Sequence, residues 1–166
     1  GKGRPYRLAE LYCRRGGLQL RHLGQPGEAA ASYLKALEQE PKSESTMGML
    51  KQIFHFQQDW LGLLRAYEYR ASLMPDNELF RLEALRQAAR LASSRLPPDS
   101  SDTLRLWSEI HGADPVDHEA ADRLETLLEL HQRWSELADL IETRLALTPD
   151  EEEAVTLRRR LARLAA

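Results

Sequence analysis

The sequence predicts an all-α protein, a solenoid of antiparallel helix pairs with about nine helices. One amphipathic stretch with its stop signal is written twice, as residues 59–76 and 133–150, in which Trp60 corresponds to Trp134. A third, more diverged copy covers residues 24–42. β-Branched residues are few and no alternating strand pattern is found, so no sheet is expected. A chain that repeats one helix and its stop is typical of stacked helical units, which mostly bind other proteins.

The first two helices are expected at residues 6–23 and 27–40, where apolar residues recur at helical spacing. Gly16 and Gly17 lie inside the first helix, where each glycine costs about 1 kcal/mol relative to alanine. We therefore expect a neighbouring helix to approach closely at these glycines. Pro41 ends the second helix.

Ser43 is expected to cap a third helix, which reaches the polar break at residues 57–59. A fourth helix starts at Trp60 and is closed by Pro75. Asp76 is then expected to cap a fifth helix over residues 78–92.

Residues 96–101, with two adjacent prolines, are the longest break in the chain and the best candidate for a mobile loop. A short helix follows at 103–111, and Asp114 is expected to cap the next one with Pro115 in its first turn. After the helix that starts at Trp134, residues 148–151 form a capping-box pattern before a last, arginine-rich helix at 154–164.

Four prolines that end helices set a period. Pro41, Pro75, Pro115 and Pro149 are separated by 34, 40 and 34 residues (75 − 41, 115 − 75 and 149 − 115). The longer middle interval is explained by the two-proline loop. We therefore predict one domain over residues 1–166, expected to be a fragment of a larger protein. Its units are expected roughly at 10–43, 44–77, 78–117 and 118–151, followed by a partial unit at 152–166.

A period of 34 residues with two helices per unit resembles the tetratricopeptide-repeat family. In the first unit the family's small, aromatic and proline positions are matched by Gly17, Ala29, Tyr33, Ala36 and Pro41. Later units match less well, and large residues at small positions, Leu63, Arg70, Leu137 and Arg144, should widen the helix separation. The Trp-x-x-Leu starts at Trp60 and Trp134 resemble a divergent bacterial branch. The resemblance implies a right-handed superhelix whose first helices line a concave groove.

Carrying the family's groove positions over to this chain gives a candidate peptide-binding groove. Its residues are Arg14, Leu18, Arg21, His22, Met49, Gln52, His55, Phe56, Arg86, Arg90, Asp122, Thr126 and Glu129. This groove would be basic at one end, aromatic in the middle and acidic at the other, so a peptide with an acidic segment could bind along it. Leu18 and Met49 stand where the family's chaperone-tail clamp needs asparagine, so chaperone C-termini are not expected as partners.

No catalytic, metal or cofactor site is expected. His118 and Asp122 are spaced like part of a zinc-protease helix, but the second histidine that this motif requires is missing. Acidic clusters such as residues 151–153 lie at predicted helix N-termini, where the helix dipole favours negative charge. No glycine-rich phosphate loop follows a strand. The protein is therefore expected not to be an enzyme.

The composition and net charge of the chain limit the classes of partner that it can bind. With 166 residues, 42% of them hydrophobic and 30% charged, the chain can bury a core. The formal net charge of −3 argues against binding driven by phosphate neutralisation, so nucleic acid is an unlikely partner. The only cysteine, Cys13, can form no internal disulfide, and no apolar run could cross a bilayer. The compartment stays open, with the cytoplasm favoured.

The leading functional hypothesis is a non-catalytic scaffold that binds a protein or peptide segment. A structural spacer or homodimerisation module is the alternative, so a homo-oligomer stays open. A nucleic-acid-binding helical repeat is third, because the last helix carries Arg158, Arg159, Arg160 and Arg163. The large indoles of Trp60, Trp107 and Trp134 are expected in the core, as wedges between units.

Overall fold

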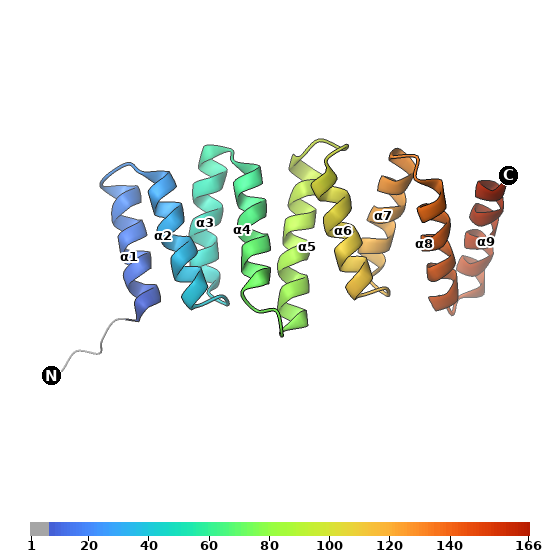
Figure 1. Cartoon of the computed structure of the whole chain (residues 1–166), viewed down its shortest axis with the longest axis horizontal. Coiled ribbons are helices and arrows are strands. Elements are labelled where there is room, and N and C mark those ends of the chain that lie inside the picture. The colour runs from blue at the N-terminus through green and yellow to red at the C-terminus, as the bar shows by residue number, and fades with distance from the viewer. Residues whose placement is uncertain (1–6) are drawn as a thin grey trace. The chain divides into compact units, whose positions relative to one another are not determined.

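The computed structural model describes residues 7–166, and this part of the chain is all-helical, with nine α-helices and no strand (Figure 1). In chain order the helices are α1 (Leu8–Arg21), α2 (Pro26–Gln39), α3 (Glu44–Gln57), α4 (Trp60–Ser72), α5 (Glu78–Arg95), α6 (Ser101–Ala113), α7 (His118–Leu130), α8 (Trp134–Leu147) and α9 (Glu151–Ala165). Tyr6, the expected start of the first helix, lies outside the described residues. The predicted all-α solenoid of consecutive helix pairs is confirmed.

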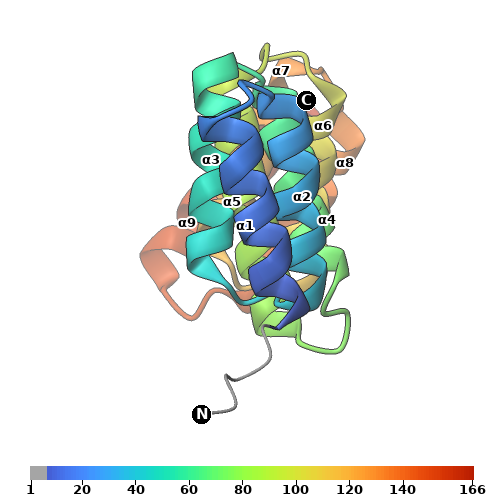
Figure 2. The same ribbon diagram turned by 90° about the vertical axis from the view of Figure 1, so that its left-hand side faces the viewer.

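The helices group into two compact units, which divide between Leu91 and Ala92, inside α5. In unit 1, α1 packs on α2, α2 on α3, and α3 on α4. The odd-numbered helices α1 and α3 lie on one side of this unit and α2 and α4 on the other (Figure 2). In unit 2, α6 packs on α7, α7 on α8, and α8 on α9. Contact between sequence neighbours is the defining property of a helical-repeat fold.

The most extensive helix contact in unit 1 joins α1 to α2, where the paired glycines lie. Gly16 and Gly17 are buried against the ring of Tyr33. A Cβ added at Gly16 would come within 2.8 Å of Tyr33 Cε2. The expected close approach of a neighbouring helix is therefore confirmed. Deeper in this contact, the Ser32 hydroxyl donates to Gln19 Oε1 over 2.6 Å.

Arg70, on α4, ties three helices together. It is only 3% exposed. Its Nε donates to the Pro41 carbonyl at 2.9 Å, its guanidinium also binds the Glu44 carboxylate at the start of α3, and it lies 5.1 Å from the centre of the Phe80 ring of α5. This arginine fills a position that is small in the family the sequence resembles, and it contacts α3 through the Glu44 carboxylate and α5 through the Phe80 ring.

The three tryptophans occupy three different environments. Trp107 is fully buried and donates its indole N–H to Ser93 Oγ over 2.9 Å. Trp60 is half-buried, with its ring edge-on to His55 at 4.8 Å between centroids. Trp134 is 48% exposed, so the prediction of a buried wedge is wrong there. As the first residue of α8, its side chain lines an open cleft between α8 and α9 and does not enter the core.

The helix caps agree with the sequence at Ser43 and differ at two of the proline turns. Ser43 Oγ accepts the Thr46 N–H, as predicted. α5 is capped by Asn77, which accepts the Phe80 N–H at 3.1 Å, and not by Asp76.

α7 is likewise capped by Asp117, which accepts the Ala120 N–H at 3.0 Å, and not by Asp114. The reason is that a turn precedes each of these helices. The backbone N–H of Asn77 donates to the Met74 carbonyl, and that of Asp117 donates to the Asp114 carbonyl. Pro75 and Pro115 lie inside these turns, so each cap lies later in the chain than predicted. α5 still begins at Glu78, as expected, whereas α7 begins at His118, after the turn that contains Pro115.

The capping box predicted at residues 148–151 is absent. Asp150 caps α9 by accepting the Glu152 N–H at 3.1 Å. The Thr148 hydroxyl instead donates to the Arg144 carbonyl at the end of α8.

Candidate protein-interaction surface

A cavity lies between the C-terminal ends of α1 and α3 in unit 1. Its volume is ≈ 620 Å³, and it is lined by Leu20, Gly24, Pro26, Gln52, Ile53 and Phe56. Within unit 1, α1 and α3 both end at the upper side in Figure 1, and residues near these two helix ends line the cavity. Phe56 is 86% exposed, unusually high for so large an apolar side chain. The cavity therefore offers an apolar anchor point that the fold does not use.

The predicted basic residues of α1 are at the surface. Arg14 and Arg21 are exposed and lie seven positions apart, so they share one face of the helix. Arg21 Nε donates to the Gly17 carbonyl at 3.3 Å, and the guanidinium lies 2.8 Å from where a Cβ on Gly17 would be. Leu18 is 56% exposed, and His22 is exposed directly after the helix. This end of α1 presents positive charge beside apolar surface.

The predicted residues of α3 also reach the surface. Gln52 and Phe56 line the cavity, Met49 is half-buried, and His55 is exposed. His55 is fixed at both ends of its ring, because Nδ1 lies 3.0 Å from the Lys51 carbonyl and the ring packs on Trp60. Leu20, Gly24, Pro26 and Ile53 were missed by the sequence prediction, which considered only family groove positions.

The two arginines predicted on α5 lie in unit 1. Arg86 is half-buried and its guanidinium is 3.9 Å from the Glu83 carboxylate, one turn earlier. Arg90 is exposed. Neither arginine is among the residues that line the cavity between α1 and α3.

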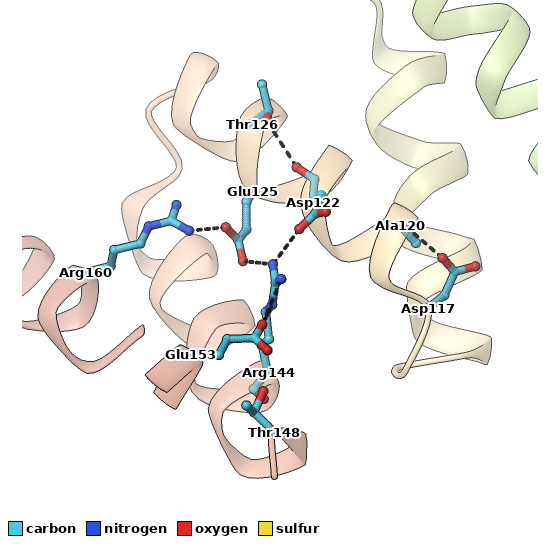
Figure 3. Close-up of polar contacts among 9 residues, drawn as sticks. All are labelled: Asp117, Ala120, Asp122, Glu125, Thr126, Arg144, Thr148, Glu153 and Arg160. Carbon is cyan, nitrogen blue, oxygen red and sulfur yellow. Dashed lines mark hydrogen bonds and ion pairs between the residues drawn. The ribbon is translucent and has the colours of Figure 1, made fainter. Parts of the chain in front are cut away.

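The predicted acidic residues of α7 face the helices that follow. Asp122 accepts a hydrogen bond from Arg144 at 2.6 Å (Figure 3). Glu129 lines a small cavity of ≈ 110 Å³ together with Arg160 and Arg163. Both predicted acidic side chains thus lie beside arginines of the same unit.

Asp122 belongs to a charge cluster that joins α7, α8 and α9. Arg144 also binds Glu125 and Glu153, while Arg160 binds the second carboxylate oxygen of Glu125 (Figure 3). The Glu125 side chain is only 7% exposed, so it depends on these two arginines for its charge to be stable there. Burial acts to lower the pKa of Arg144, but its hydrogen bonds with Asp122 and Glu125 outweigh this and raise it.

A second cavity lies in unit 2 at the repeat-equivalent place. Its ≈ 190 Å³ lie between the end of α5, the two-proline loop, α6 and α7. Three of its residues lie 74 positions after residues of the first cavity (126 − 52, 127 − 53 and 130 − 56): Thr126, Leu127 and Leu130. The two cavities thus recur between equivalent helices, and of the predicted groove residues of α7 only Thr126 lines this one. The repeat offset of 74 residues was visible in the sequence and could have located it.

The arginine-rich helix α9 uses part of its charge internally. Arg158 pairs with Glu151 at 2.9 Å, and Arg160 pairs with Glu125. Arg159 and Arg163 are exposed. Intramolecular pairing reduces the positive charge that this helix offers to a phosphate backbone.

Two further properties concern residues 7–166. No group of three or more His, Cys, Asp or Glu side chains in this range is arranged to hold a metal ion. None of the helices described is long and apolar enough to pass through a membrane.

In comparisons with known proteins, no family model matches the chain, and no curated protein matches it.

Proposed function

We propose that this protein is a non-catalytic scaffold of the tetratricopeptide type that binds a peptide segment on the α1–α3 face of unit 1. The observation that supports it best is the open cavity with Phe56 at its rim. The Phe56 side chain is 86% exposed, which lowers the solubility of the unbound protein. Covering it with an apolar partner residue would be favourable.

The charges around this face define the partner's chemistry. Arg14, Arg21 and Lys51 are exposed on α1 and α3. A peptide with an apolar anchor residue and acidic neighbours would complement both the cavity and this positive charge. The helices that present these groups are already folded, so binding would order the peptide and little of the protein. The cytoplasm, favoured by the sequence, is the compartment we propose.

The apolar anchor can be tested with two matched variants. Partners are captured from the source organism with the wild-type chain, identified by mass spectrometry, and titrated as purified segments. Phe56→Asp is expected to weaken binding at least tenfold. Leu79→Asp is the control, because Leu79 is 84% exposed on α5 and lies outside the cavity. Equal losses in the two variants, or none in Phe56→Asp, would refute the anchor.

The charge requirement has its own test. Reversing Arg14 and Arg21 together to glutamate is expected to weaken the same segment at least tenfold, with a larger loss at low salt because surface charges are less screened there. Lys42→Glu, an exposed reversal in the α2–α3 loop, is the matched control. An affinity that is unchanged in the Arg14→Glu/Arg21→Glu variant would show that the partner does not bind through acidic residues at this site.

Homodimerisation is the second candidate, and a cleft in unit 2 favours it. Trp134, Leu161 and Leu164 line an open cleft of ≈ 440 Å³ between α8 and α9. α8 exposes acidic residues and α9 exposes Arg159 and Arg163, so two antiparallel copies would place opposite charges together. Light scattering over a range of concentrations distinguishes this function from the scaffold. A dimer that Trp134→Ser dissociates would support homodimerisation, and a monomer at all concentrations would exclude it.

A further inference from the structure

The cavity of unit 2 is lined by hydrogen-bond donors in an otherwise apolar setting. Its apolar walls are Leu96, Pro98, Leu127 and Leu130, and its polar groups are Ser93, Thr103, Arg123 and Thr126. No carboxylate is among the lining residues in the described part of the chain. An interior of this kind is complementary to a ligand that brings acceptors and a small apolar body.

The hydroxyl of Ser93 is available as a hydrogen-bond donor. Its oxygen accepts the indole N–H of Trp107 at 2.9 Å, and no acceptor for its own hydroxyl hydrogen is found among residues 7–166. A hydroxyl that already accepts one bond donates more strongly in the next, because hydrogen bonds in a chain polarise one another. Ser93 is therefore ready to donate to a ligand oxygen.

Thr103 and Arg123 point to the same ligand chemistry. The Thr103 residue is only 4% exposed and its Oγ1 makes no hydrogen bond, which is unusual for a buried hydroxyl. Arg123 lines the cavity on α7, and its guanidinium forms no ion pair within the described residues. Arg123, Leu127 and Leu130 follow one another at helical spacing, so charge and apolar surface face the cavity from one side of α7.

We propose that this cavity binds a small apolar carboxylate. The Arg123 guanidinium pairs with the carboxylate, the Ser93 hydroxyl donates to it, and the apolar body lies against Leu96, Leu127 and Leu130. The volume of ≈ 190 Å³ is below the roughly 300–1,000 Å³ of sites for drug-sized ligands, which limits the ligand to about the size of one aromatic ring with its acid group. This site is independent of the peptide face of unit 1.

Benzoate and benzamide form the probe pair for the test, because they share one shape and differ in charge. Binding to the full chain is measured by titration calorimetry. It is measured again by the fluorescence of Trp107 in a Trp60→Phe/Trp134→Phe background, since the Trp107 indole bonds directly to Ser93. Benzoate is expected to bind saturably and at least tenfold more tightly than benzamide.

Two variants localise the site. Arg123→Gln is expected to weaken benzoate at least tenfold and to leave benzamide unchanged, because only the charged pair is lost. Arg159→Gln, which removes an exposed arginine of α9, is expected to change neither. Circular dichroism checks that each variant keeps its helicity. Equal affinity for the two probes, benzoate binding that Arg123→Gln does not weaken, or no saturable signal up to roughly 10 mM benzoate would each overturn the proposal.

Discussion

Two repeat-equivalent arginines, Arg70 and Arg144, show how single residues hold this fold together. Each lies near the end of a second helix and binds both the helix before it and the helix after it. Both residues are large and charged at positions where the tetratricopeptide-repeat pattern has a small residue. Their burial makes sense only with their partners, because an unpaired charge is costly in the interior.

We expect Arg144→Ala to destabilise the protein by about 2–4 kcal/mol, since it leaves the buried Glu125 carboxylate with one arginine in place of two. The measurement is chemical denaturation followed by circular dichroism. Arg158→Ala is the control, because its pair with Glu151 is largely exposed and should contribute less than about 1 kcal/mol. Similar losses in both variants would mean that the cluster adds nothing beyond a surface pair.

We expect His111 to make the free energy of unfolding depend on pH in the acid range. Burial lowers the pKa of His111, although Asp117 and Asp114 partly oppose this shift. The unfolded chain therefore takes up the proton at a higher pH than the folded one. The stability that this residue contributes is fully present above about pH 6.5, the pKa in the unfolded chain, and is lost as the pH falls from there through the lower pKa of the folded state.

We accordingly expect His111→Gln to flatten the curve of unfolding free energy against pH between about pH 7 and pH 5. The measurement is urea denaturation of both proteins at several pH values. A variant whose curve stays parallel to that of the wild type would show that the histidine does not supply this dependence.

At the scale of the helix, glycine has opposite meanings at two positions. Gly16 on α1 permits the contact with Tyr33, whereas a Cβ added at Gly48 on α3 would meet nothing within 4 Å. The local preference for alanine over glycine in a helix is the same at both. The difference is therefore entirely one of packing.

We expect Gly16→Ala to destabilise the protein by about 1–3 kcal/mol, because the buried Tyr33 ring cannot retreat. Gly48→Ala should stabilise it by up to about 1 kcal/mol. Thermal unfolding of the two variants beside the wild type checks both signs. A gain in stability for Gly16→Ala would contradict the close contact.

At the scale of the whole molecule, each helix contacts mainly its neighbours in the sequence. A destabilising mutation should therefore lower stability near the mutated helix and much less elsewhere. In such repeat folds, coupling between distant units is carried only through the units between them. We expect Gly16→Val to speed amide hydrogen exchange in α1–α4 and to leave α6–α9 near the wild-type rate. Exchange read by mass spectrometry checks this. A uniform increase along all helices would mean that the two units unfold as one.

The sequence by itself determined the helices and their order. The period of the prolines, the helical spacing of apolar residues and the repetition of one helix can all be read from the order of residues. They therefore predict the helices without knowledge of the fold. The Gly16–Gly17 contact was also readable, because glycines inside a helix need a neighbour to justify them. The capping residues Asn77 and Asp117 were missed, since the turn before each helix is closed by backbone hydrogen bonds that leave no mark in residue type.

Only the tertiary structure decided which side chains meet. Asp122 was predicted in a groove, and its contact with Arg144 depends on how α7 and α8 face each other. Trp107 and Trp134 look alike in the sequence, yet one is enclosed by its neighbours and the other stands at the open edge of a helix pair. Burial and pairing are set by residues far apart in the chain, whereas helix formation is set by residues within a few turns, and this difference in range separates what could be predicted from what could not.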